Sequence, residues 1–167
     1  MRRMVLSILV DNTSGVLSRV SGLFSRRGYN IDSLTVSETQ DEKLSRMTVA
    51  VTGDDPILEQ IKKQVAKLED VREIQELKEF ESVCRELVLV KVAAGKKERE
   101  SVISVADIFR AKIVDVAEES LMVELTGNQA KIDAFINLLS SYTILELVRT
   151  GLTGLGRGAR DIADYMD

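Results

Sequence analysis

The spacing of hydrophobic residues changes along the chain, and these changes predict its secondary structure. Residues 4–10 (MVLSILV) are mostly aliphatic, which indicates a strand that is apolar on both faces. Apolar residues within 16–24 then recur at helical spacing, and Gly28 behind two arginines is a suitable helix stop. The next expected elements are strands over 29–37 and 44–51, a helix behind Asp54 with proline in its first turn, and a strand over 71–77.

The order strand, helix, strand, strand, helix, strand is that of the ferredoxin-like fold. Right-handed crossovers would place both helices on one face of a four-stranded antiparallel sheet. The other face would remain open. Because the strand over 4–10 is apolar on both sides, we expect a partner to cover or extend this sheet.

The same order of elements repeats in the second half of the chain. The segment MTVAVTGDDPILEQI, which begins at Met47, matches LMVELTGNQAKIDAF, which begins at Leu121, and both contain a Thr-Gly pair. We therefore predict an α+β protein of two tandem ferredoxin-like (βαββαβ) domains. The predicted parts are a first domain at 1–78, a linker at 79–86, a second domain at 87–150 and a Gly-rich C-terminal tail at 151–167.

Composition narrows the classes of function. A net charge of -4 argues against a nucleic-acid partner, and no apolar run is long enough to span a membrane. We expect a cytoplasmic protein. The chain has no histidine and one cysteine, Cys84, so it lacks the commonest general base and cannot form an internal disulfide or a thiolate metal cluster. We therefore predict no catalytic residue and no metal site, and an enzyme is the weakest of the functions considered.

The sequence DNTSG joins the first strand to the first helix and is unusually polar. Asp11 and Asn12 form turns readily, Ser14 could cap the helix, and Gly15 tolerates a positive φ. The helix N-terminus behind them offers free N–H groups to a carboxylate, while Asp11 or Asn12 could take an ammonium group. These are the recognition needs of a free α-amino acid. The same residues also suit a plain strand-turn-helix cap, and their chemistry alone leaves both interpretations open.

A longer pattern surrounds this joint. The run LVDNTSGVLSRVSGLFSRRGYNIDSLTV, followed by LSRMTVAV, resembles the start of the regulatory (small) subunit of acetohydroxyacid synthase, also called acetolactate synthase. The resemblance continues through ILEQIKKQVAKLEDV and ELVLVKV to the tail LVRTGLTGLGRG, and so covers nearly the whole chain. It implies that the first domain is an ACT domain, a small ferredoxin-like module that binds amino acids.

The resemblance also implies a function in the biosynthesis of valine, isoleucine and leucine. The chain would be a non-catalytic regulatory subunit that activates the catalytic (large) subunit and confers feedback inhibition by valine. It would form a homodimer through the ACT domain and bind valine at the ACT–ACT interface. Thiamine diphosphate, magnesium and FAD are expected only in the catalytic partner. The residues that match the valine site are Asn12, Gly15 and Asn30, with Asp11, Val16, Leu17 and Ile31 as further expected contacts.

Two other features set limits on this hypothesis. The joint of the second domain reads KVAAGKKER and lacks the polar pattern, so we do not expect it to bind an amino acid in the same way. The tail GLTGLGRG lacks the lysine and hydroxyl residue of a phosphate-binding loop, which favours a flexible tail or a contact for another subunit.

A free-standing ACT-type amino-acid sensor with a different partner is the alternative function.

Overall fold

The computed structural model describes residues 1–162, which form two compact units. The first unit comprises Met1–Cys84 together with the described residues that follow Gly151, and the second comprises Arg85–Gly151. Each unit has the ferredoxin-like order of elements, which confirms the predicted fold class. No helix within residues 1–162 is both long and apolar enough to cross a membrane.

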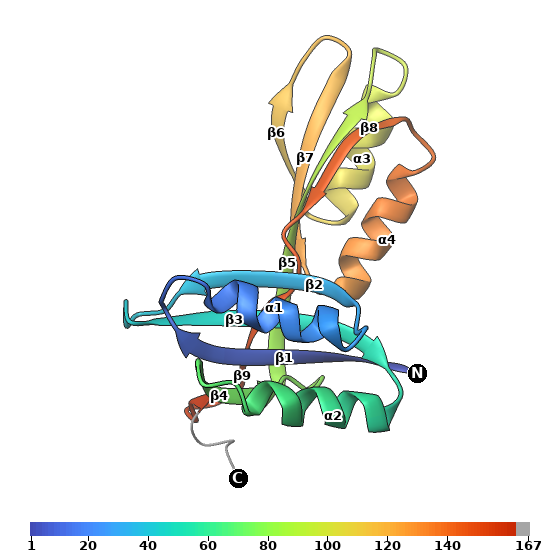
Figure 1. The fold of residues 1–167 in the computed structure, drawn as a ribbon. Coiled ribbons are helices and arrows are strands. Elements are labelled where there is room, and N and C mark those ends of the chain that lie inside the picture. Colours follow the sequence, from blue (N-terminus) through green and yellow to red (C-terminus); the bar gives the residue numbers. More distant parts are fainter. Residues whose placement is uncertain (163–167) are drawn as a thin grey trace. The chain divides into compact units, whose positions relative to one another are not determined.

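The first unit contains one antiparallel sheet and two helices (Figure 1). Its sheet has the order β2-β3-β1-β4, so β2 and β4 are the edge strands. The left-handed φ of +72° at Gly28 confirms the predicted stop behind the first helix. Its elements are β1 (Arg2–Asp11), α1 (Val16–Arg26), β2 (Ile31–Glu38), β3 (Leu44–Gly53), α2 (Asp55–Ala66) and β4 (Val71–Glu76).

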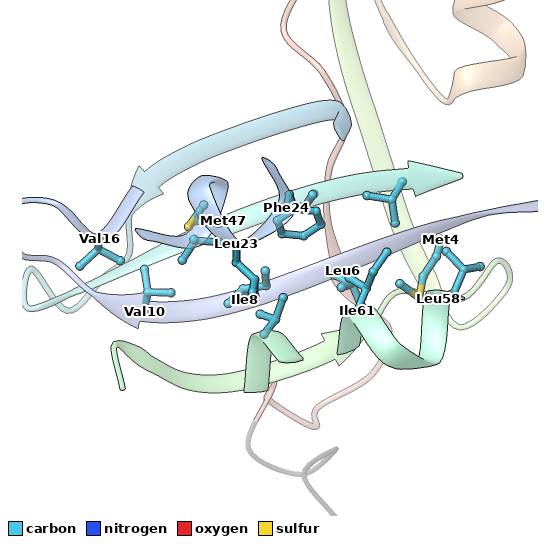
Figure 2. Packing of buried hydrophobic residues seen from close by; sticks show 14 residues of the cluster. Met4, Leu6, Ile8, Val10, Val16, Leu23, Phe24, Met47, Leu58 and Ile61 are labelled. Carbon is cyan, nitrogen blue, oxygen red and sulfur yellow. The ribbon is translucent and has the colours of Figure 1, made fainter. Parts of the chain in front are cut away.

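The core of the first unit lies between this sheet and its two helices. Figure 2 shows alternate residues of β1 pointing toward α1 and α2. None of these β1 side chains is more than 1% exposed, as the alternation of a strand requires. Because both helices contribute to the same cluster, they cover the same face of the sheet. The labelled residues are Met4, Leu6, Ile8, Val10, Val16, Leu23, Phe24, Met47, Leu58 and Ile61.

The helix-free face of the first sheet is covered by the chain itself. Ser7 and Thr48 point to this face and are only 0% and 1% exposed. The backbone N–H of Leu152 donates to Ser33 Oγ at 2.8 Å, and Thr35 Oγ1 donates to the carbonyl of Leu152 at 3.2 Å. The expectation that this face stays open was therefore wrong, because a segment far along the chain binds it.

The covering segment belongs to the stretch predicted as a flexible tail. It includes β9 (Thr153–Gly156), which pairs with β5 (Ser82–Ala93). Gly154 lies so close to β5 that an added Cβ would be 2.6 Å from Cys84 Sγ. The start of β5 also falls inside the stretch predicted as a linker. Residues 163–167 of the predicted tail lie outside the described part of the chain.

The second unit repeats the arrangement with the sheet order β6-β7-β5-β8. Its core gathers valines of β5 with Phe135 and Leu139 of the last helix. Asn128 accepts a hydrogen bond from the N–H of Lys131 at 2.9 Å and so caps the last helix. The elements that complete this unit are α3 (Arg99–Ile108), β6 (Lys112–Val116), β7 (Ser120–Gly127), α4 (Gln129–Leu139) and β8 (Ile144–Arg149).

Candidate functional site

The polar loop between β1 and α1 is the candidate site, and backbone hydrogen bonds fix its first half. The N–H of Asp11 donates to the carbonyl of Asp70 at 3.0 Å, and the N–H of Asn12 donates to the carbonyl of Lys43 at 2.8 Å. Gly15 then takes a φ of +86°, a left-handed conformation that a residue with a side chain adopts only with strain. Glycine is therefore required where the loop enters the helix.

Helix α1 begins without a side-chain cap. Its N-cap residue is Gly15, and no side chain of residues 1–162 accepts a hydrogen bond there. The expectation that Ser14 caps the helix was wrong. The first helical bond runs from the N–H of Arg19 to the carbonyl of Gly15 at 3.0 Å, so the N–H groups of the turn before it have no acceptor within the helix. These N–H groups and the positive end of the helix dipole remain for an anion.

A guanidinium group lies directly over this helix start. Arg19 donates two hydrogen bonds to the carboxylate of Asp70, from Nε at 2.6 Å and from Nη2 at 3.0 Å. The remaining nitrogen, Nη1, is 2.8 Å from the position that a Cβ on Gly15 would occupy. Hydrogen bonding from Arg19 holds the pKa of Asp70 below its ordinary value, so this carboxylate stays charged at neutral pH.

Sequence reasoning did not find either of these residues. Asp70 is 51 positions from Arg19 in the chain, and only the fold brings the start of β4 next to α1. The one local signal was the spacing of an arginine four residues after a glycine at a helix start, which places its side chain over that glycine.

The two polar candidates at the joint have different partners. The carboxylate of Asp11 accepts from Nε and Nη2 of Arg72 at 2.6 and 2.8 Å, so the structure pairs it within the chain. Hydrogen bonding to Asp11 raises the pKa of Arg72. The amide nitrogen of Asn12 donates to the carbonyl of Glu42 at 2.8 Å and to Glu38 Oε1 at 3.2 Å. No donor among residues 1–162 contacts Asn12 Oδ1, which leaves this oxygen able to accept from an ammonium group.

The three apolar candidate residues differ in how far they are buried. Val16 is 4% exposed, and its side chain belongs to the same core cluster as Val10 (Figure 2). Its backbone N–H is the part that belongs to the joint. Leu17 is 47% exposed on α1 and can contact a small apolar group there. Ile31 packs against the core from the start of β2.

Asn30 does not meet Asn12 within one chain. The register of β3 places Asp11 opposite Leu44 and Ile31 opposite Val51. The two asparagines lie just beyond these residues and therefore at opposite ends of this sheet, separated by about 30 Å at the usual rise of a strand. Asn30 is exposed, and its amide nitrogen donates to Asp32 Oδ1 at 3.1 Å.

The corresponding joint of the second unit has the opposite chemistry. A Cβ on Gly95 would lie 3.2 Å from Glu119 Oε2 and 3.7 Å from Glu98 Oε2, so carboxylates surround this glycine. The guanidinium of Arg99 folds over the joint and donates to three backbone carbonyls, those of Ala94, Ala117 and Glu118. The carboxylates of Glu98 and Glu119 would repel an anion at this joint, and Arg99 already donates to backbone carbonyls.

The two units match two family models. Residues 6–73 match the AHAS small subunit-like ACT domain, and residues 85–158 match the small subunit of acetolactate synthase. The chain is 50% identical to the acetolactate synthase small subunit of Haemophilus influenzae, over 96% of this chain and 99% of that protein. It is 49% identical to the acetolactate synthase isozyme 3 small subunit of Salmonella typhimurium, over 93% of this chain and 96% of that protein.

A solved structure agrees with these matches. The crystal structure of the acetolactate synthase small subunit from Thermotoga maritima superposes with a TM-score of 0.86 at 39% sequence identity. The match covers 96% of this chain and 100% of that one. The likeness therefore includes both units.

Proposed function

The chain belongs to the family of acetolactate synthase small subunits, and from this membership we propose that it regulates a catalytic large subunit in branched-chain amino-acid biosynthesis. It raises the activity of that subunit, and it confers feedback inhibition when valine binds to its first unit. The single observation that carries the inhibitory role is the uncapped start of α1 behind Gly15, where donors for a carboxylate stand free. All of the chemistry on 2-keto acids belongs to the partner.

The joint offers a contact for each part of valine. The carboxylate binds the N–H groups of Val16 and Leu17 at the helix start, where the dipole favours negative charge. The ammonium group donates to Asn12 Oδ1. The isopropyl group packs on the exposed side chain of Leu17. Asp11 contributes indirectly, because its pairing with Arg72 ties the end of β1 to β4 and holds the loop in place.

Two copies of the chain complete the site. β2 is an edge strand, and Val36 on it is 44% exposed. Antiparallel pairing of β2 with its own copy would set the start of one strand against the end of the other. Asn30 of the second copy would then lie beside Glu38, whose carboxylate already contacts the Asn12 amide. Valine bound between the copies would be coupled to their arrangement, because it binds one arrangement better than another.

Complementation tests whether the site is shared. Asn12→Ala and Asn30→Ala each remove one half, so each variant alone should lose valine binding. In a mixed dimer, one of the two sites contains the intact Asn12 of one chain and the intact Asn30 of the other. We expect mixing to restore binding at half of the sites formed in mixed dimers, measured by calorimetry after the chains have exchanged. If both variants lose binding and their mixed dimer binds no valine, the two asparagines do not meet across an interface.

Reconstitution tests the regulatory role. Adding the chain to the purified catalytic subunit should raise acetolactate production and make it sensitive to valine, whereas the chain alone should form no product. Acetolactate made by the chain alone would overturn the proposal. For the alternative, a free-standing sensor, a pull-down from native lysate would recover a different enzyme or a transcription factor in place of the acetolactate synthase large subunit.

A further inference from the structure

We propose that Arg19 is an effector-binding residue and that its Nη1 donates to the carboxylate of the bound amino acid. The inference rests on the proposed function, because it concerns the same site. It adds a charged side chain to a site that otherwise consists of backbone N–H groups and neutral amides.

The hydrogen bonds of Arg19 assign a direction to each nitrogen. Nε and Nη2 form a fork with the two oxygens of Asp70, the geometry in which arginine pairs best with a carboxylate. Nη1 takes no part in this fork and has no acceptor among residues 1–162. It lies over Gly15, 2.8 Å from the missing Cβ, at the end of the helix where N–H groups are also free. Two kinds of donor therefore converge on one place.

Asp70 holds the guanidinium of Arg19 in this orientation and leaves its Nη1 available. Its side chain is 16% exposed and its carboxylate binds Nε and Nη2, whereas Nη1 is the nitrogen nearest Gly15. The carbonyl of Asp70 also binds the N–H of Asp11, so the fork is anchored to the end of β1. A guanidinium held at one edge gives up less rotational freedom when a ligand binds its other edge.

Helix α1 contains a second arginine in the same relation to a glycine, and the difference between them is informative. Nη1 of Arg26 lies 3.2 Å from where a Cβ on Gly22 would be, again four residues earlier. Gly22 is inside the helix, where its N–H group and those of its neighbours bond to carbonyls of the preceding turn. An arginine over a glycine is therefore a feature of helical spacing, and it forms a carboxylate site only at Gly15.

Calorimetric titration of the full chain with valine tests the inference, with Arg26→Gln as the matched control. Arg19→Gln should weaken valine binding about tenfold, the lower end of what a charge-assisted hydrogen bond contributes at an exposed site. Arg26→Gln should bind like the wild type. The wild-type affinity should also fall more steeply with added salt than that of Arg19→Gln, because one charge pair has been removed.

The outcomes separate this inference from the proposed function. If the wild type binds no valine, the proposed site fails and the inference fails with it. If the wild type binds valine and Arg19→Gln binds equally well with the same salt dependence, only the role of Arg19 is overturned. Arg19→Lys, which keeps the charge without the fork, should lie between the two and guards against misfolding of the glutamine variant. Weakening by Arg26→Gln as large as that by Arg19→Gln would also contradict the inference, since it would show a general effect of charge on α1.

Discussion

The two strand-to-helix joints of this chain occupy the same place in the same fold, yet their chemistry is opposite. At Gly15 the helix starts with no side-chain cap from residues 1–162, and Nη1 of Arg19 lies above it. At Gly95 the nearest groups are carboxylate oxygens, and the arginine of that joint is bonded to backbone carbonyls. The ferredoxin-like order of elements therefore does not fix the charge at a joint, and the side chains around the glycine do.

The helix-free faces of the two sheets differ as well. The first is covered by the segment around Leu152, which is 3% exposed. In the second sheet, Val148 remains 57% exposed, and a hollow opens beside it. The first unit is thus completed by the end of its own chain. The residues that line the hollow are Leu89, Lys91, Met122, Glu146, Leu147 and Val148.

The largest expected effect on valine binding comes from adding a negative charge at the first joint. Gly15→Asp would force a side chain into a left-handed conformation and place its own carboxylate against Arg19, where the effector is proposed to bind. We expect valine to bind more than about 100-fold more weakly. The measurement is valine inhibition of the reconstituted enzyme.

Gly95→Asp is the matched control for this change, because it introduces the same side chain at the corresponding joint. It should leave valine inhibition unaltered. Inhibition that survives Gly15→Asp unchanged would mean that the site has been placed wrongly, and inhibition lost with Gly95→Asp would remove the contrast between the joints.

The next effect tests the two helix-free faces. Leu152→Ala should lower the free energy of unfolding by about 2–3 kcal/mol, because it removes a buried side chain from a packed surface. Val148→Ala on the open face should change it by less than about 0.5 kcal/mol. Urea unfolding followed by circular dichroism measures both. Equal effects would show that the segment around Leu152 does not support the first unit.

A smaller difference in unfolding free energy is expected between substitutions at the N-caps of α4 and α2. Asn128 caps α4 through a hydrogen bond, so Asn128→Ala should cost about 1 kcal/mol of unfolding free energy. Asp54 stands at the same position before α2, but no side-chain bond caps that helix within residues 1–162. Asp54→Ala should therefore cost clearly less in the same urea experiment. A larger loss for Asp54→Ala would show that its ion pair with the N-terminus outweighs a cap.

The smallest effect is a dependence on pH at the exposed pair of Arg19 and Asp70. Hydrogen bonding to Arg19 lowers the pKa of Asp70 in the folded chain. A carboxylate with a lowered pKa stabilises the fold at neutral pH, and this contribution disappears as the pH falls through the folded pKa. The difference in unfolding midpoint between the wild type and Asp70→Asn should therefore shrink below about pH 4. A difference that grows toward acid would reverse the assigned sign.

The sequence predicted what depends on local period and on special residues. The run of aliphatic residues located β1, and Gly28 marked the stop of the first helix. The local pattern also suggested Ser14 as the cap of α1, and this was wrong. The pattern cannot show that Gly15, in a left-handed conformation, is itself the N-cap residue.

What escaped prediction depends on residues that are distant in the chain. Arg19 and Asp70 are 51 positions apart, and Thr35 and Leu152 are 117 apart. Such pairs carry no period that could reveal them, and glycines in a tail resemble a flexible linker until a close contact such as Gly154 against Cys84 is seen. The valine contacts at Asn12, Gly15 and Asn30 remain predictions, supported by resemblance and by the free donors of the joint.

Titration calorimetry of the full chain with valine tests the central contrast most directly, because it counts occupied sites. The account predicts one valine per chain in the dimer, bound by the first joint and absent in Gly15→Asp. Two valines per chain would show that the second joint binds as well. Undiminished heat with Gly15→Asp would show that the amino acid binds elsewhere.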